Sequence, residues 1–136
     1  MRVVAGVDSS SQSCTVSLHN FLTGDLLGVG NSPHPKTTPP CSEQDPEEWW
    51  KAFRIALFDA CKAANLQPSD IGAISFAAQY HGLVALDSKN RVLRPVKLWN
   101  DTTSSTQAQK LVDKLGPAEW ARRSGSVPTS AFTISK

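Results

Sequence analysis

The opening strand and the turn that follows it constrain the fold of this chain most. An apolar run rich in β-branched residues, Val3–Val7, has no helical spacing and predicts a buried strand over residues 2–8. The strand ends at Asp8, small hydroxyl residues follow, and a second strand pattern occupies residues 13–19. A tight turn of small residues can direct successive backbone N–H groups at one point, which makes an anion-binding site without a basic side chain.

The carboxylate of Asp8 adds a metal hypothesis to this turn. Mg²⁺ prefers carboxylate, water and phosphate oxygens, so Asp8 is a candidate to hold a hydrated Mg²⁺ beside a bound phosphate. Asp and Ser are also ordinary turn residues, because their side chains bond to their own backbone. On these residues alone, both interpretations stay open.

Composition limits the class of protein. The 136 residues predict one domain large enough for a real core. With 14 Lys and Arg against 12 Asp and Glu, the chain shows neither a nucleic-acid footprint nor an acidic tail. Three cysteines without metal spacing favour free thiols in a reducing cytosol. No apolar run has the length of a membrane span and no signal-peptide pattern opens the chain, so we expect a soluble cytoplasmic α/β protein.

Residues 26–29 predict a third strand, which completes an antiparallel meander. Residues 32–40 hold four prolines and predict an extended surface connection. A helix then begins with Asp45 as N-cap and Pro46 at the first helical position, and it ends near Asn65. Its apolar residues recur at helical spacing and must lie on the sheet, and we assign Trp50 to this core in preference to a ligand platform. The stripe is Trp49, Phe53, Leu57 (or Ala56), Ala60 and Ala64.

Residues 71–78 are apolar on both faces, which predicts a covered strand reached by a helical crossover. Gln79, Tyr80 and His81 follow it directly. Ligands gather at the carboxyl ends of parallel strands, so if this strand and the first are parallel neighbours, we expect these residues and Asp8 to face one crevice. Taken singly, a histidine such as His81 is more often a structural residue than a ligand.

The remaining chain predicts short elements. A hairpin is expected from a strand at 83–86, a turn at 87–90 and a return strand at 91–93. Helices are expected at 107–115, which stops at Gly116, and at 117–123. The tail has no closing signal, and a further element can begin in residues 131–134.

Five segments, in this order, resemble one family. Gly6–Ser13 resembles the first phosphate motif of the FGGY carbohydrate kinases, which belong to the actin/hexokinase/Hsp70 ATPase superfamily. Ser42–Trp50 is similar to the Glu-Gln-Asp-Pro…Trp-Trp helix start of xylulokinases, and Gln79–Gly82 to their Gln-Met-His-Gly turn. Arg94–Asp101 resembles their Arg-Pro…Leu-Trp-Asn-Asp segment, with Phe132–Lys136 similar to Phe-Thr-Ala-Pro-Lys.

The resemblance implies a ribonuclease H-like α/β fold with a mixed sheet that opens with a three-strand antiparallel meander. It also implies that residues 1–136 form about the first half of the N-terminal domain of a two-domain kinase. The second phosphate motif, the catalytic Asp and the adenosine-binding segment are then expected beyond Lys136. The implied reaction of the intact enzyme is ATP-dependent phosphorylation of D-xylulose to xylulose 5-phosphate, with this chain inactive by itself. Another sugar or polyol kinase (glycerol, gluconate, ribulose, fuculose) or a non-enzymatic fragment is the alternative.

The resemblance also assigns roles residue by residue. Asp8 is expected to hold Mg²⁺ and to orient the ATP phosphates, beside the backbone of Ser9, Ser10, Ser11 and Gln12. The sugar-binding candidates are Gln79, Tyr80, His81, Asn100 and Asp101. The expected small-molecule partners are therefore a sugar and ATP, with no nucleic acid or membrane. A homodimer, or self-association of the fragment through its exposed sheet, is also expected.

Three positions depart from the family pattern. Ser10 stands where Gly is usual, and its side chain limits how closely a phosphate can approach the backbone. Thr15 stands where a Lys or Arg commonly neutralises phosphate charge. Thr103 stands where an Arg often follows the Trp-x-Asp segment. A ribonuclease H-like nuclease shares the same element order, but its two-metal chemistry needs further carboxylates, and residues 71–78 carry none.

Overall fold

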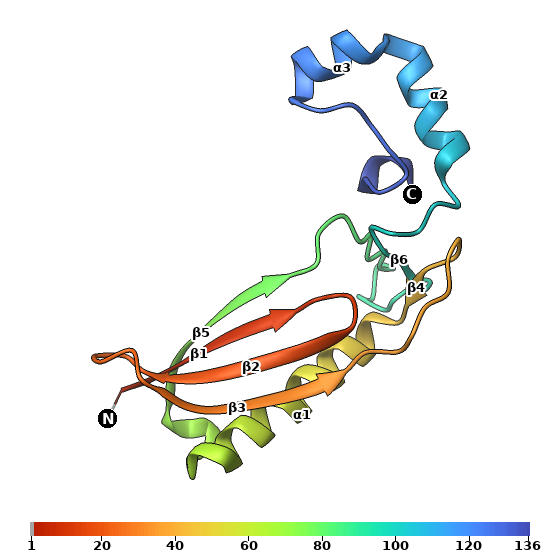
Figure 1. Cartoon of the computed structure of the whole chain (residues 1–136). Helices are drawn as coiled ribbons and strands as arrows, with labels where there is room; N and C mark the ends of the chain where they lie inside the picture. The colour runs from red at the N-terminus through yellow and green to blue at the C-terminus, as the bar shows by residue number, and fades with distance from the viewer. Residues whose placement is uncertain (1) are drawn as a thin grey trace. The chain divides into compact units, whose positions relative to one another are not determined.

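The computed structural model describes residues 2–136 and divides the chain into two compact units (Figure 1). Unit 1 comprises Met1–Lys36 and Glu47–Gln79, and unit 2 comprises Thr37–Pro46 and Tyr80–Lys136. Unit 2 has a small core of its own around Val96 and Leu98, both fully buried. The expectation that residues 1–136 belong to one domain stays a prediction.

Unit 1 is built on a four-stranded mixed sheet of order β3-β2-β1-β5. β1 (Val3–Ser9), β2 (Ser13–Asn20) and β3 (Leu26–Pro33) form the predicted antiparallel meander. β5 (Ile71–Ala78) pairs with β1 in parallel, as the helical crossover required, and a short 3₁₀ turn, η1 (Pro68–Asp70), precedes it. The polar residues after β1 and β5 therefore lie at the same end of neighbouring strands.

Helix α1 (Pro46–Ala64) begins at the predicted residue and lies against one face of this sheet (Figure 1). Asp45 occupies the position before the first turn, and acidic side chains in that turn face the positive end of the helix dipole. Small residues let the helix approach the sheet closely. Its buried residues are Ala52, Phe53, Ala56, Ala60 and Cys61, and they pack with Val3, Ala5, Val7, Cys14, Val16 and Leu18.

Four expectations about unit 1 need correction. Trp50 is 57% exposed because it lies beside the buried stripe of α1, and its ring centroid lies 5.2 Å from that of Phe53. The third strand reaches Pro33, and the proline-rich connection is not wholly on the surface, because Ser32 and His34 are buried.

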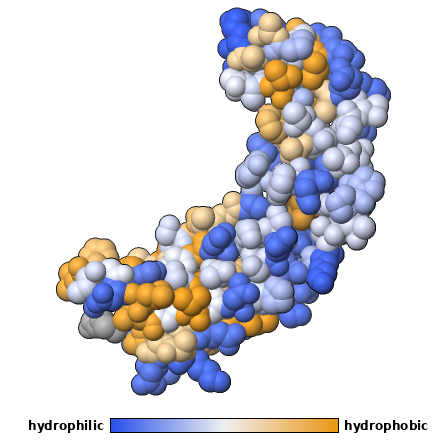
Figure 2. Space-filling view, viewed as in Figure 1, coloured by the Kyte–Doolittle hydropathy of each residue, from blue (hydrophilic) through white to orange (hydrophobic). Residues whose placement is uncertain are grey.

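β5 is the fourth correction, because it is not covered on both sides. Seven of its eight residues are exposed, and Phe76 remains 57% exposed although its ring contacts Phe53. Within residues 2–136, β5 is an edge strand of this sheet and pairs with β1 alone. Phe21 and Leu22 are exposed at the β2–β3 turn, where Figure 2 shows a group of hydrophobic side chains.

Unit 2 holds a two-stranded sheet, β4 (Glu43–Gln44) and β6 (Val96–Lys97), that the sequence did not predict. Helices α2 (Ser105–Leu115) and α3 (Pro117–Ser124) confirm the two expected helices within two residues at each end. A 3₁₀ turn, η2 (Thr133–Ser135), forms in the tail.

The strand predicted at 83–86 is absent from unit 2. The segment makes one isolated bridge, between Leu86 and Val92. The turn at 87–90 does form, because the Asp87 carboxylate accepts hydrogen bonds from the backbone N–H groups of Lys89 and Arg91, and Asn90 takes a left-handed conformation with φ of 60°. One isolated bridge is too short to make these segments the paired strands of a β-hairpin.

Within residues 2–136, the helices lack the combination of length and hydrophobicity that crossing a lipid bilayer requires.

Candidate functional site

The turn after β1 carries the first group of candidate residues. Asp8 is exposed at the end of β1 and is paired with Thr15 of β2. The backbone N–H of Ser10 donates to the Ser13 carbonyl oxygen at 3.1 Å, and this bond closes the turn. Ser10 and Gln12 are exposed, while Ser9 and Ser11 are partly buried, so the turn presents hydroxyls and backbone beside the carboxylate.

The end of β5 joins this turn through two hydrogen bonds. The backbone N–H of Gln79 donates to the Ser9 carbonyl oxygen at 3.0 Å, and the Ser11 hydroxyl donates to the Gln79 side-chain oxygen at 3.3 Å. The Gln79 amide nitrogen is buried and has no hydrogen-bond partner among residues 2–136. The structure therefore brings Asp8, the serine turn and Gln79 together, and it leaves an amide donor there for another group.

His34 supports the same turn, and nothing in the sequence pattern selected it. Its Nε2 atom lies 3.3 Å from the Ser9 hydroxyl, and its backbone N–H donates to the Gln12 carbonyl oxygen at 2.8 Å. Burial lowers the pKa of His34 below its ordinary value of 6.5, so the imidazole is neutral at pH 7. The prolines on both sides of His34 mark a connection, and no local pattern indicates that this side chain turns inward.

Unit 2 carries the second group of candidates, centred on His81. This residue has a left-handed backbone with φ of 62°, a conformation that costs energy outside glycine and clusters at functional sites. Its imidazole packs against Phe132 with centroids 4.5 Å apart, and the Tyr80 ring meets it edge-on at 4.6 Å. Tyr80 also stacks on Trp99 at 6.2 Å. We call Tyr80, His81, Trp99 and Phe132 the aromatic group.

Asp101 is fully buried and holds the backbone of unit 2 together. One carboxylate oxygen accepts the Ser42 N–H at 2.8 Å, and the other accepts the Thr103 N–H at 2.9 Å and its hydroxyl at 2.5 Å. Burial acts to raise the pKa of Asp101. The hydrogen bonds from Thr103 and Ser42, with the Lys97 charge, outweigh burial and hold the pKa below 3.8. The carboxylate is thus committed to protein contacts.

Asn100, next to Asp101, is the freer candidate. Its side-chain oxygen is buried and accepts no hydrogen bond from any described residue. The segment that presents it is fixed from the tail, because the Lys136 ammonium donates to the carbonyl oxygens of Lys97, at 3.1 Å, and Leu98. Burial lowers the pKa of Lys136.

One acidic cluster in unit 2 is already neutralised. Cys41, Glu43 and Asp101 offer ligand atoms within 4.8 Å of one another. Glu43 forms ion pairs with Arg94 at 2.6 Å and with Lys97 at 2.9 Å, and the Glu43 hydrogen bond raises the pKa of Lys97. These cations satisfy the charge that a metal ion would otherwise balance.

The turn after β1 fits Mg²⁺ and phosphate. An exposed carboxylate suits a hydrated Mg²⁺, and hydroxyls with turn N–H groups suit phosphate oxygens. The orphaned Gln79 amide nitrogen adds a donor at the same strand end. Asp8 lies in unit 1 and His81 in unit 2, and the expectation that they face one crevice stays a prediction.

Comparison with known proteins gives a consistent family. Residues 3–136 match the N-terminal domain of the FGGY family of carbohydrate kinases. A Streptomyces coelicolor protein named xylulose kinase is 41% identical over 135 residues, which are 98% of this chain and 27% of that protein. The Streptomyces rubiginosus protein of the same name is 40% identical over 135 residues, again 98% of this chain and 27% of that protein.

A solved structure extends the comparison to the fold. The crystal structure of xylulose kinase from Bifidobacterium adolescentis matches with a TM-score of 0.86 at 35% identity, over 98% of this chain and 28% of that one. The mixed sheet and its meander thus have the ribonuclease H-like α/β fold of the actin/hexokinase/Hsp70 ATPase superfamily. The chain belongs to the FGGY family of carbohydrate kinases. It spans about a quarter of the length of the two Streptomyces relatives (27% of each).

Proposed function

We propose that this chain is the N-terminal part of an ATP-dependent kinase that phosphorylates D-xylulose to xylulose 5-phosphate. The observation that carries the proposal is the turn of Asp8–Gln12, joined to Gln79 through hydrogen bonds from Gln79 to Ser9 and from Ser11 to Gln79. The relatives that support the choice of sugar are named xylulose kinase and are 40% identical or more over nearly the whole chain. Three free thiols agree with a reducing cytoplasm.

Phosphoryl transfer asks mainly for in-line positioning and charge neutralisation. In this proposal the Asp8 carboxylate holds hydrated Mg²⁺, which neutralises the ATP phosphates when bound, and the turn backbone and hydroxyls position the phosphate oxygens. His34 fixes the Ser9 hydroxyl from the protein side. Ser10 and Thr15 replace a glycine and a cation of the family pattern, so Asp8 supplies a larger share of the phosphate site.

The sugar-binding candidates in this proposal include buried polar atoms that have no hydrogen-bond partner among residues 2–136. In unit 1 the Gln79 amide nitrogen is such a donor, and in unit 2 the Asn100 side-chain oxygen is such an acceptor for a sugar hydroxyl. The aromatic group holds His81 in its left-handed conformation, so that the imidazole has one orientation toward the sugar. Asp101 positions Asn100 through the backbone, and direct contact of its carboxylate with sugar is the less favoured role.

In this proposal the catalytic residues come from more than one segment of a longer enzyme. Residues 1–136 form about the first half of the N-terminal domain, and the general base for the attacking hydroxyl comes from another segment. The 136-residue chain alone is therefore expected to show no ATP-dependent phosphorylation of D-xylulose in a coupled ADP-release assay. Turnover above background would mean that the base lies within these residues.

Asp8→Asn tests the magnesium role in an enzyme that carries this chain at its N-terminus. We expect kcat/KM for Mg·ATP to fall by about 100-fold or more, because a charge that is worth several kcal/mol in the transition state is removed. D-xylulose affinity, measured by calorimetry without nucleotide, should stay within about twofold of the parent value. Asp25→Asn is the matched control, since Asp25 is exposed in the β2–β3 turn.

The same assay separates the alternatives. The proposal fails in its choice of sugar if ribulose, glycerol or gluconate is used with a higher kcat/KM than D-xylulose. It fails in its site if Asp8→Asn and Asp25→Asn have the same activity.

A further inference from the structure

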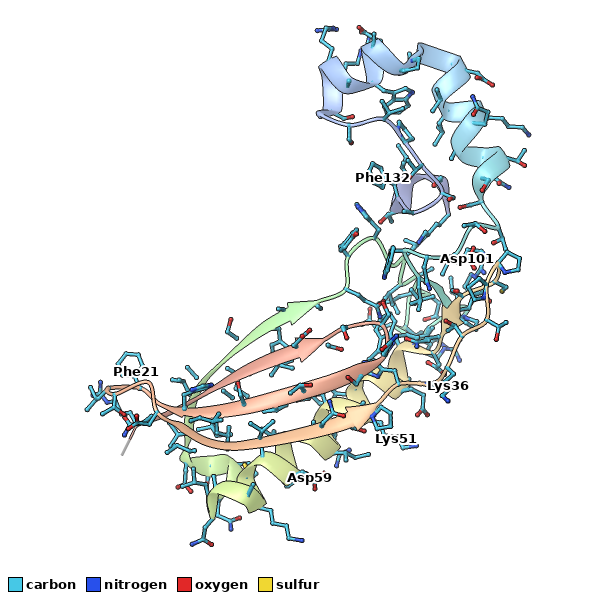
Figure 3. The ribbon with its side chains drawn as sticks, in the orientation of Figure 1. Phe21, Lys36, Lys51, Asp59, Asp101 and Phe132 are labelled. Atoms are coloured by element: carbon cyan, nitrogen blue, oxygen red, sulfur yellow. The ribbon has the colours of Figure 1, made fainter. Side chains whose placement is uncertain are left out.

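His34 contacts the turn after β1 at both of its ends. Its backbone N–H donates to the Gln12 carbonyl oxygen at 2.8 Å, and its Nε2 atom lies 3.3 Å from the Ser9 hydroxyl. Figure 3 labels Lys36, two residues beyond His34, at the end of unit 1 that lies opposite Phe21 and the β2–β3 turn. One residue of the connection after β3 thus holds the first and the last residue of the segment Ser9–Gln12.

The Ser9 hydroxyl lies on the core face of the sheet, opposite to the Asp8 carboxylate. Side chains alternate between the two faces of a strand, and Ser9 continues the buried row of β1 that ends at Val7, whereas Asp8 is exposed. Ser9 is also paired across the strands with Cys14, which is fully buried. His34, itself 5% exposed, therefore contacts the turn from the core side and leaves the Asp8 side to a ligand.

The hydrogen bonding of His34 is selective. Its Nδ1 atom is buried and has no partner among residues 2–136, so the contact of the ring with Ser9 is made at Nε2 alone. A buried polar atom without a partner is unfavourable, and an apolar side chain would avoid that energy. Pro33 and Pro35 restrict the backbone angle φ on both sides of His34. The position thus favours a side chain that can hydrogen-bond to the turn over one that only fills space.

We infer that His34 is a positioning residue for the phosphates of ATP, because it holds the backbone of Ser9–Gln12 in one conformation before the nucleotide binds. This role rests on the proposed function, since it requires a nucleotide at the turn. Donors that are already in place lose little conformational entropy when phosphate binds, and a misplacement of about 1 Å costs about 100-fold in rate. His34 acts only through the turn and makes no contact with the nucleotide.

Two amide variants separate this role from one in folding alone. In His34→Gln the side-chain amide reaches the place of Nε2 and keeps a bond to Ser9, whereas in His34→Asn it reaches only the place of Nδ1. The imidazole is neutral at pH 7, because burial lowers the pKa of His34, so a neutral amide is a fair replacement. The backbone bond from residue 34 to Gln12 is kept in both variants.

The enzyme that carries this chain at its N-terminus is measured with three readouts. For His34→Asn we expect kcat/KM for Mg·ATP to fall by about tenfold or more, and the affinity for the non-hydrolysable analogue Mg·AMP-PNP, measured by calorimetry, to weaken by a similar factor. D-xylulose affinity without nucleotide should stay within about twofold of the parent value. In the nucleotide-free enzyme, peptides that cover residues 9–12 should exchange their amide hydrogens about tenfold faster. His34→Gln should resemble the parent in all of these measurements.

Ser9→Ala removes the same contact from the other side. If the bond between Ser9 and Nε2 transmits the effect, the double variant Ser9→Ala/His34→Asn should be no weaker than either single variant. His19→Asn is the matched control, because His19 is partly buried in β2 and its Nε2 atom lies 3.1 Å from the Ser17 hydroxyl, away from the turn. It should leave the Mg·AMP-PNP affinity and the exchange of residues 9–12 unchanged.

The positioning role is overturned if residues 9–12 exchange at the parent rate in His34→Asn, or if they exchange faster while Mg·AMP-PNP affinity and kcat/KM keep their parent values. Equal losses in His34→Gln and His34→Asn also overturn it, because the Nε2 contact is then not the cause. A parent enzyme that binds Mg·AMP-PNP and does not phosphorylate D-xylulose refutes the proposed function alone, and exchange with analogue affinity still decides the role of His34. A parent enzyme that does not bind Mg·AMP-PNP refutes both.

Discussion

Asp101 carries a carboxylate that solvent does not reach, and it is satisfied by three hydrogen bonds and an ammonium 3.6 Å away. Such a group stabilises the fold only while every partner is in place, because a buried acceptor or donor without a partner costs its full desolvation energy. Its bond to Ser42 links two segments that are 59 residues apart in the sequence. The residue that the family pattern suggested for substrate thus has a structural role in unit 2.

Replacement of Asp101 by Asn should destabilise unit 2 by about 2–4 kcal/mol, because an amide nitrogen then faces a backbone N–H donor. Urea unfolding followed by the NMR signals of unit 2 measures this difference. Asp113→Asn, an exposed residue of α2, is the control and should change the free energy of unfolding by less than about 0.5 kcal/mol.

The lowered pKa of Asp101 determines how folding stability changes with pH. The folded-state pKa lies below the ordinary value of 3.8, so the unfolded chain binds the proton more readily. The stabilisation is complete well above pH 3.8 and is lost as the pH falls through the folded-state pKa. The stability difference between the parent and Asp101→Asn should therefore shrink on acidification below about pH 4, and a constant difference would contradict the assignment.

At the level of elements, glycines in β3 set how closely α1 approaches the sheet. A Cβ atom on Gly30 would lie 2.0 Å from the Ala56 carbonyl oxygen, and one on Gly28 would lie 2.5 Å from that of Ala60. Both contacts are with helix backbone, which cannot rotate away. The absence of side chains at these positions is therefore a packing requirement of the helix–sheet layer.

Gly30→Ala should destabilise unit 1 by about 3 kcal/mol or more, because α1 must move outward and lose contact with the core. The matched control is Gly72→Ala in β5, where a Cβ atom would lie 3.6 Å from the Val3 carbonyl oxygen, an ordinary contact. Chemical denaturation followed by circular dichroism compares the two variants. Equal effects would mean that α1 does not pack this closely on β3.

The sequence predicted elements well where local chemistry decides them. Pro46 with the acidic first turn determined the start of α1, and the β-branched runs determined the meander. The sequence-based prediction was wrong where burial or pairing depends on distant residues. Residues 71–78 are apolar, yet β5 is an exposed edge strand. Residues 83–86 have the residue pattern of a strand but form only one isolated bridge, between Leu86 and Val92.

The candidate site shows the same division. Asp8 and Gln79 were predictable, because both follow strand ends whose parallel pairing the crossover implies. His34 was not selected, and Trp99 and Phe132 appeared only within segments that resemble the family, because each acts through a contact with a residue 19 or more positions away. No periodicity or local spacing encodes such contacts.

For the molecule as a whole, the two units have unequal cores. Unit 1 buries eleven apolar residues in one cluster, whereas the buried apolar residues of unit 2 are Val96, Leu98 and Ala108 among those that the structure describes. Local stability follows buried apolar contact and hydrogen bonding. Unit 2 depends more on its polar network around Asp101 and on the Lys136 bonds.

Hydrogen exchange should therefore separate the units, with the β4 and β6 amides of unit 2 exchanging before those of β1 and β2. Leu98→Ala removes a fully buried side chain and should accelerate the unit 2 amides by about 30-fold or more, with the unit 1 amides unchanged. Leu18→Ala, equally buried in β2, is the reciprocal control and should accelerate unit 1 amides. If either variant accelerates both sets equally, the chain unfolds as one cooperative body and the inequality of the cores has no consequence for its stability.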